Sequence, residues 1–330
     1  MKNLLLGMLA MAAMVSCSSE NDPIDDVTGG KQDKVEIKLN AGVGTITTKA
    51  PIVPGFTNDL TVYFFKPEDA ADAQSADWAT GSVLTATLAH SDKKISFGKN
   101  PQYYNTNGNL SFLAGCYIDD ATTETSTIAT DLSTGTLKLN IDGTQDIMAT
   151  DGQSGSKVAA FGSFTFNHQL AQLEFVVAPK NVADVEIIKT LFGKVTKIEV
   201  KNQVKALELK LQSGNPTLGK QTGAKEDEVF TVTAADGGID IGENAMLGQA
   251  LIYPEATLGQ TANLINLVVY TANGPAAGYA VTAQIGDGNQ TLTKSTKYTI
   301  TLNFSKSEVS AEGSVGTWGT GSAGSADEIK

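Results

Sequence analysis

The sequence predicts an all-β protein built from antiparallel β-sandwiches. Apolar residues recur at every second position in many segments, which is the pattern of strands with one buried face. Glycine is abundant, with 33 residues in a chain of 330, and Gly, Asn, Asp and Pro separate the apolar runs. Helix signals are few and short. Many short strands between turn residues are typical of sandwiches and not of parallel sheets covered by helices.

Residues 1–16 have the features of an export signal. Lys2 gives a positive start, and the uncharged apolar run Leu4 to Val15 follows it. This run has about a dozen residues, fewer than the roughly 20 that a helix needs to cross a bilayer. Met14-Val15-Ser16-Cys17 resembles a lipobox, in which the cysteine is acylated and becomes the first residue of the mature protein. We therefore expect a lipid on Cys17; the alternative is an ordinary secretory signal with a chance cysteine.

The segment 17–33 is predicted to be an acidic flexible tether. Ser18 to Gly30 is rich in Ser, Asp, Glu and Gly and has no apolar face that could pack. Such a spacer would hold a folded body away from a membrane. The lipid and the spacer together predict a protein of the outer membrane that is exposed at the cell surface.

Two sandwich domains are expected after the tether, at 34–166 and 167–330. Asn167-His168 marks the boundary because it interrupts the apolar alternation between two strand patterns. No repeat of roughly 20 to 50 residues is visible, which disfavours a solenoid or a propeller. The expected strands lie near residues 35–39, 60–64, 83–87, 137–141 and 161–166, and then near 173–177, 195–200, 206–211, 229–233, 264–270, 280–285 and 298–304.

Two short helices are expected between the strands. Pro67 to Trp78 begins with a proline suited to a first helical turn, and acidic residues follow it. Asn181 to Phe192 carries apolar residues at helical spacing, among them Val182, Val185 and Ile188. Both would be minor elements of an otherwise all-β chain.

Charge and composition argue against several classes of function. A net charge of -12 and a pI near 4.6 disfavour nucleic acid as a partner, because a phosphate backbone is bound by clustered basic residues. All 24 basic residues are lysine, so the chain contains no arginine. Once Cys17 is acylated, Cys116 is the only other thiol, and no disulfide within the chain is expected. With 2 His residues, neither a metal site nor a cofactor is expected.

The candidate catalytic and binding motifs are weak. His168 has no recognisable nucleophile or metal-ligand set, and we interpret it as a hydrogen-bonded structural histidine at the domain boundary. Asp119-Asp120 and similar acidic pairs lie in polar turns without the spacing of a calcium loop. The sequence therefore predicts no catalytic residue and no enzyme. A sugar-stacking platform is conceivable from aromatic residues that are more often part of a core, namely Trp78, Tyr103, Tyr104, Tyr117 and Trp318.

Several short motifs, taken in their order, resemble the fimbrillin family of Bacteroides-type bacteria. They are the lipobox with its acidic tether, the strand Leu60 to Phe65, the segment Asp146-Ile147-Met148-Ala149, the stretch Phe166 to Phe175 and the Trp318-Gly319 tail. The resemblance covers most of the chain after Cys17. It implies two transthyretin-like β-sandwich domains and a structural role in a type V pilus, or fimbrium, with other pilus subunits as partners.

The resemblance also implies a mode of assembly. An outer-membrane precursor is cut after a basic residue beyond its first strand, that strand leaves, and a neighbour's C-terminal strand fills the groove by β-strand addition. Here the first strand corresponds to Val35-Ile37-Leu39, and Lys49-Ala50 matches the position of cleavage. The candidate donor strand lies within 305–318, after the last evident core strand at Phe304, and carries small apolar residues at Val309, Ala311 and Val315.

The absence of arginine leaves two interpretations of this cleavage open. Cleavage in the best-known family members resembles that by an arginine-specific protease. Either Lys49 is cut by a protease of broader specificity, or the subunit is never cut. An uncut subunit would keep its lipid and suit an anchor at the pilus base. A surface adhesin or glycan-binding lipoprotein, with a host or bacterial surface ligand, is the further alternative.

Overall fold

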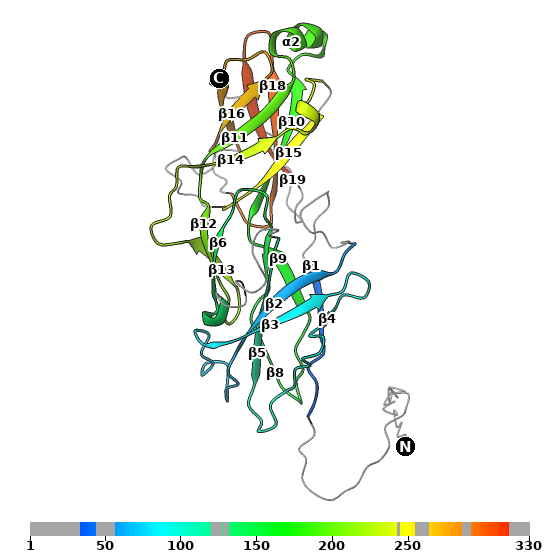
Figure 1. The fold of residues 1–330 in the computed structure, drawn as a ribbon, viewed down its shortest axis with the longest axis vertical. Helices are drawn as coiled ribbons and strands as arrows, with labels where there is room; N and C mark the ends of the chain where they lie inside the picture. The colour runs from blue at the N-terminus through cyan, green and yellow to red at the C-terminus, as the bar shows by residue number, and fades with distance from the viewer. Residues whose placement is uncertain are drawn as a thin grey trace, which may run out of the picture. The chain divides into compact units, whose positions relative to one another are not determined.

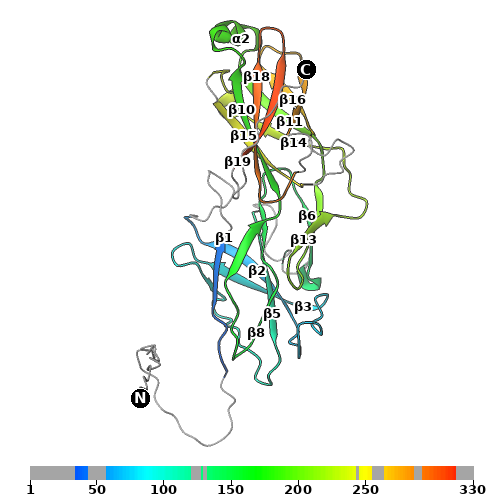
Figure 2. The same cartoon turned by 180° about the vertical axis from the view of Figure 1, so that it is seen from behind.

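The regular secondary structure of the computed structural model is almost entirely β-strand (Figure 1, and from behind in Figure 2). The structure describes residues 34–43, 57–119, 128, 132–242, 245–254, 264–285 and 292–316. In these ranges the strands form two sheets of eight strands and one sheet of three. The all-β class and the presence of two β-sheet bodies, which the sequence predicts, are confirmed. The domain boundary at 166/167 stays a prediction.

The first sheet closes on itself. Its neighbours, in order, are β2 (Leu60–Pro67), β3 (Gly81–Leu88), β4 (Lys94–Ser96), β1 (Leu39–Val43), β9 (Phe164–His168), β7 (Ile147–Ala149), β5 (Ser111–Ile118) and β8 (Gln153–Gly155). β2 pairs with β3 and also with β5, and this second pairing closes the sheet. Closure of this kind removes free sheet edges, and β1 consequently has a neighbour on each side.

The second sheet contains the C-terminal half of the chain, from green to red in Figure 1. Its order is β14 (Glu228–Thr233), β11 (Val195–Gln203), β16 (Leu264–Thr271), β17 (Tyr279–Gln284), β19 (Val309–Gly316), β18 (Lys297–Phe304), β10 (Ala171–Pro179) and β15 (Ala245–Ile252). Most neighbours are antiparallel, as predicted. β1 and β9, and likewise β10 and β18, run parallel, and the long stretches of chain between them provide the crossover that parallel strands need.

A third, small sheet joins the two halves of the sequence. β6 (Thr136–Asn140) pairs with β12 (Ala206–Lys210), and β12 pairs in turn with β13 (Thr217–Lys220). The apolar residues Leu137 and Leu139 of β6 face the same buried cluster as Leu207 and Leu209 of β12. A strand from one half is thus hydrogen-bonded to strands from the other.

Two apolar clusters stabilise the described residues. The first lies inside the closed sheet and contains Phe64, Phe164 and Phe166, with the Phe64 and Phe164 ring centroids 5.2 Å apart in an edge-on arrangement. The second contains the core of the second sheet and also Phe65 of β2. Because successive side chains of a strand point to opposite faces, β2 contributes Phe64 to one cluster and Phe65 to the other. Both faces of β2 are therefore buried, whereas the sequence pattern predicts one.

One of the two expected helices is present. Asn181 caps the start of the segment by accepting a hydrogen bond from the Ala183 amide at 3.0 Å, after which come η2 (Val182–Asp184) and α2 (Val185–Phe192). The short 3-10 turns η1 (Leu132–Thr134) and η3 (Ala235–Gly237) lie elsewhere in the described chain.

The prediction of a helix over Pro67 to Trp78 is wrong. β2 ends at Pro67, and bends follow it. The Asp72 carboxylate accepts hydrogen bonds from the amides of Gln74 and Ser75, and the Asp77 carboxylate accepts one from the Ala79 amide. These hydrogen bonds from backbone amides to aspartate side chains compete with the backbone hydrogen bonds that a helix would need.

Candidate subunit interface

The N-terminal strand lies between two other strands. Leu39 is paired with Ile95 of β4, and Ala41 is paired with Phe164 of β9. The pairing continues ahead of β1, where the Ile37 amide donates to the Gln102 carbonyl at 2.7 Å. Main-chain hydrogen bonds to residues 93–104 therefore hold residues 35–41, and pairing with β9 holds residues 41–43.

The side chains of this segment alternate between the core and the surface. Ile37 and Leu39 are each 3% exposed, and Ala41 and Val43 are also buried, so four alternate residues point into the closed sheet. Beside them, between the segment and β4, lies a groove of about 440 Å³ lined by residues that include Leu39, Ile95 and Phe97. Removal of 34–43 would leave an apolar channel with unpaired strand edges on β4 and β9.

The C-terminal strand is part of the second sheet. β19 pairs antiparallel with β18 along its whole length, from Val309 opposite Phe304 to Gly316 opposite Lys297. Ala311 is 6% exposed, while Val309 and Val315 are partly buried against the core. The expectation that the core strands end at Phe304 is corrected here, because the alternating residues after it complete the sheet. The donor role of Val309, Ala311 and Val315 stays a prediction.

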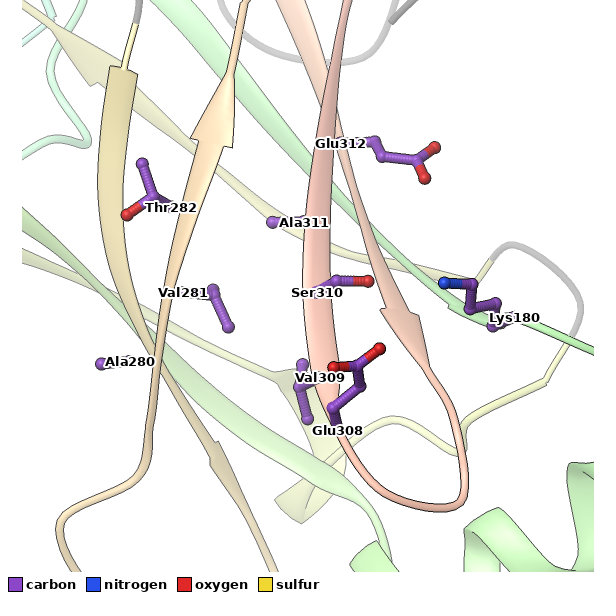
Figure 3. Close-up of a pocket in the computed structure, with 9 residues that line it drawn as sticks. All are labelled: Lys180, Ala280, Val281, Thr282, Glu308, Val309, Ser310, Ala311 and Glu312. Atoms are coloured by element: carbon purple, nitrogen blue, oxygen red, sulfur yellow. The ribbon is translucent and has the colours of Figure 1, made fainter. Parts of the chain in front are cut away.

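The other side of β19 is only loosely connected. β17 and β19 share a single pair of residues, Gln284 and Glu312. Beyond this pair the two strands separate and line a groove of about 240 Å³, into which Val281 and Val309 project (Figure 3). No other pairing of β19 with β17 occurs among the described residues.

The remaining site residues predicted from the sequence lie outside the described residues. Cys17, the predicted lipid attachment site, precedes residue 34, and Lys49 and Ala50 fall between residues 43 and 57. Lys49 follows the last residue of β1, Val43, by six positions in the sequence. Lipid attachment and cleavage stay predictions.

His168 has the structural role that the sequence analysis assigns to it. Its side chain is 2% exposed, and its Nδ1 lies 2.8 Å from Oδ1 of the equally buried Asp146. The His168 carbonyl accepts a hydrogen bond from Ser295 Oγ at 2.6 Å. His168 ends β9 of the first sheet, and Ser295 precedes β18 of the second. This polar cluster connects the two sheets; the sequence analysis did not identify Asp146 as the partner, because 22 positions separate it from His168.

The described residues offer no evident chemistry. Burial raises the pKa of the Cys116 thiol to about 12, which keeps it protonated and unreactive. Within the described ranges, no group of three or more His, Cys, Asp or Glu side chains could hold a metal ion. The helical segments among these residues are all too short or too polar to cross a membrane.

The aromatic residues considered for a sugar platform do not gather on one surface. Tyr104 is 4% exposed and its ring is stacked on Phe161, at 5.6 Å between centroids. Trp78 packs against Phe65 and Phe112, and Tyr117 is buried. Tyr103, at 42% exposure, is accessible. Trp318 lies outside the described residues.

Comparison with known proteins shows to which group of proteins the fold belongs. A candidate cell adhesion protein from Bacteroides uniformis is 15% identical, with a TM-score of 0.57 over 88% of this chain and 100% of that chain. A second, from Bacteroides ovatus, is 12% identical, with a TM-score of 0.53 over 90% of this chain and 100% of that chain. At such identities the similarity concerns the fold. The sequence matches none of the curated proteins with which it was compared.

The family model named fimbrillin-like matches residues 48–318. This range includes most strands of the first sheet and all strands of the other two. The chain therefore belongs to the fimbrillin-like family.

Proposed function

We propose that this chain is a structural subunit of a cell-surface pilus, exported as a lipoprotein and joined to its neighbours by β-strand addition. Membership of the fimbrillin-like family supports a role as a pilus subunit or an adhesin. The observation that most supports strand addition is the position of segment 34–43. It is an N-terminal segment that lies between two other strands of a closed sheet.

The first strand supports an acceptor role for the first sheet. Loss of 34–43 would expose the edges of β4 and β9 and the sites occupied by Ile37 and Leu39. An incoming strand with alternating apolar residues could restore both the main-chain pairing and the buried contacts. Burial of such side chains stabilises a complex by roughly 25 cal/mol per Å² of apolar surface.

The last strand supports a donor role for the C-terminus. β19 has alternating small apolar residues, and among the described residues it pairs with β18 along its whole length but with β17 at a single position. A strand held in this way can leave its own body at a smaller free-energy cost than one paired on both sides. The same alternation would allow it to occupy a groove in a neighbour.

Cleavage near Lys49 would be the event that releases the first strand. Mass spectrometry of the N-terminus of the surface-exposed protein tests this directly. A mature N-terminus at Ala50, lost in Lys49→Gln together with assembly, is the expected result. A mature N-terminus at acylated Cys17 in protein recovered from pili would contradict cleavage and support the uncut anchor.

A reversible cross-link tests the donor role without removing any strand. Thr301 and Glu312 are paired neighbours on β18 and β19, so Thr301→Cys/Glu312→Cys places two thiols at a separation suited to a disulfide. We expect the oxidised protein to remain folded but to assemble poorly, and the reductant to restore assembly.

The matched control is Asn266→Cys/Thr282→Cys, which links β16 to β17. This pair lies in the same sheet and should leave assembly unchanged. Normal assembly of the oxidised Thr301→Cys/Glu312→Cys protein would exclude β19 as the donor.

The adhesin alternative has less support in the described residues. A glycan platform would need several accessible aromatic rings on one surface. Of the aromatics considered, Tyr104 and Tyr117 are buried and Trp78 packs against other aromatic rings.

A further inference from the structure

Gly313 lies at the point where β19 meets β17. A Cβ atom at this position would lie 2.5 Å from the Gln284 carbonyl oxygen and would also collide with the Ile285 side chain. The oxygen belongs to the backbone and cannot turn aside as the end of a side chain could. The close approach of the two strands therefore requires glycine at position 313.

This contact coincides with the single pairing between the strands. Gln284 and Glu312 are the paired residues, and Gly313 follows directly. Toward its start, β19 faces the groove lined by Ala280, Val281 and Val309 (Figure 3). Around Glu312 and Gly313 the strand is thus held from both sides, and over 309–311 it is paired with β18 alone among the described residues.

We propose that Gly313 is a latch that controls the release of β19 from its own sheet. The start of β19 is tied to β18 by the turn Ser305–Glu308, in which the Ser305 amide donates to the Glu308 carbonyl at 2.9 Å. β19 consequently separates from its other end, beginning at Gly316. Separation must pass three residues before it reaches Gly313. Only after that does it reach residues 309–311, the part of the strand that is paired on one side.

The position of the latch gives it control over the whole strand. While Gly313 is seated against Gln284 and Ile285, only the last residues of β19 can fray. Once it is displaced, the pairs formed by Val309, Ser310 and Ala311 with β18 have no main-chain pairing to β17 beside them among the described residues. The significance of this control for assembly rests on the proposed function, whereas the latch itself is a property of the single chain.

Hydrogen exchange of the full chain, monitored by mass spectrometry, tests the latch. Gly313→Ala should accelerate exchange of the β19 amides by about tenfold or more, the scale of an overpacking clash. Exchange in β2 and β3 of the first sheet should not change. Cleavage at Glu312 by a glutamate-specific protease should accelerate in parallel.

The matched control is Gly219→Ala. Gly219 also lies in a strand, β13, but a Cβ atom there would meet no atom within 4 Å. It should leave the exchange of β19 unchanged. Unaltered β19 exchange in Gly313→Ala would overturn the proposal.

A cross-link covers the case in which Gly313→Ala unfolds the whole protein. Gln284→Cys/Glu312→Cys joins the paired residues beside the latch and should slow β19 exchange by about tenfold when oxidised. An oxidised protein with unchanged β19 exchange would also overturn the proposal. One outcome separates the two proposals. If β19 exchange changes as expected in both variants while assembly stays unchanged, Gly313 controls the release of β19 but β19 is not the donor strand of the proposed function.

Discussion

The first and last strands of the described chain are similar in sequence pattern but differ in how they are held. Leu39 and Asn40 of β1 pair with β4 and residues 41–43 pair with β9, and Ile37, Leu39, Ala41 and Val43 are almost fully buried. β19 is fully paired with β18 but shares one residue pair with β17 within the described ranges, and two of its three apolar residues are partly exposed. Alternation thus predicts both strands, whereas their burial and their pairing with neighbours, which differ, depend on the register of the folded chain.

This difference fits the two roles proposed. In the proposed function the first strand is part of a closed sheet and leaves it after a covalent cut beyond the strand. A strand with one loose side can separate by thermal motion. The three predictions below test the comparison, from the largest expected effect to the smallest.

The largest effect is expected from truncation of a buried side chain of β1. Leu39→Ala should lower the free energy of unfolding by about 3 kcal/mol, because it leaves a cavity in a closed core. Val309→Ala, its counterpart on β19, should cost less than about 1 kcal/mol because Val309 is only partly buried. Urea denaturation measures both. Equal losses of unfolding free energy in the two variants would show that β1 and β19 are held equally strongly, which would contradict the difference described above.

A smaller effect is expected from the polar cluster between the two sheets. His168→Ala removes the partner of the buried Asp146 carboxylate and should cost about 2 kcal/mol. The control is His90→Ala, since His90 forms a similar pair with Asp59 at 2.6 Å but is 47% exposed. It should change stability by less than about 0.5 kcal/mol. A loss in His168→Ala no greater than in His90→Ala would show that the buried pair contributes nothing to the junction.

The smallest effect concerns a surface cluster on β11 of the second sheet. Lys197 and Lys201 donate hydrogen bonds to the Glu199 carboxylate, at 2.8 and 2.6 Å, and lower its pKa from 4.5 to about 2. A lowered folded-state pKa contributes stability that is present above pH 4.5 and is lost as the pH falls toward 2. This would make the sheet that holds β19 sensitive to acid independently of β1.

Glu199→Gln should therefore lower the free energy of unfolding by about 1 kcal/mol at pH 7 and by almost nothing near pH 2. Thermal melting across this pH range measures the difference. The control Glu186→Gln changes a carboxylate that is 82% exposed and should show little effect at any pH. A Glu199→Gln deficit that does not shrink toward acid would contradict the assigned cause.

The sequence predicts the parts of this fold that depend on local patterns. The alternation at Ile37 and Leu39 predicts the residues that point into the closed sheet, and the apolar spacing after Asn181 predicts α2. The segment after Pro67 is wrongly predicted as a helix because hydrogen bonds from aspartate side chains decide its backbone. Capping of this kind depends on geometry that residue types alone do not determine.

The parts that could not be predicted depend on long-range pairing. The contact of β6 with β12 joins residues about seventy positions apart, and no periodicity carries that register. Gly313 is one of 33 glycines in the chain, and its close contact with β17 is visible only when the register of both strands is known. The pairing of β19 with β18 is different, because it is a local hairpin across the turn Ser305–Glu308 that the alternation after Phe304 could have indicated.

The small sheet of β6, β12 and β13 has a mechanical consequence. In the proposed pilus, a filament that holds a cell to a surface would be loaded in tension, and each subunit would carry that load from one of its ends to the other. In this chain the covalent connection from β9 to β10 is not the only link between the halves, because five residues of β6 are paired with five of β12. Pulling the two sheets apart would therefore require the pairing of β6 with β12 and the apolar contacts behind it to break, and straightening the connection from β9 to β10 would not suffice.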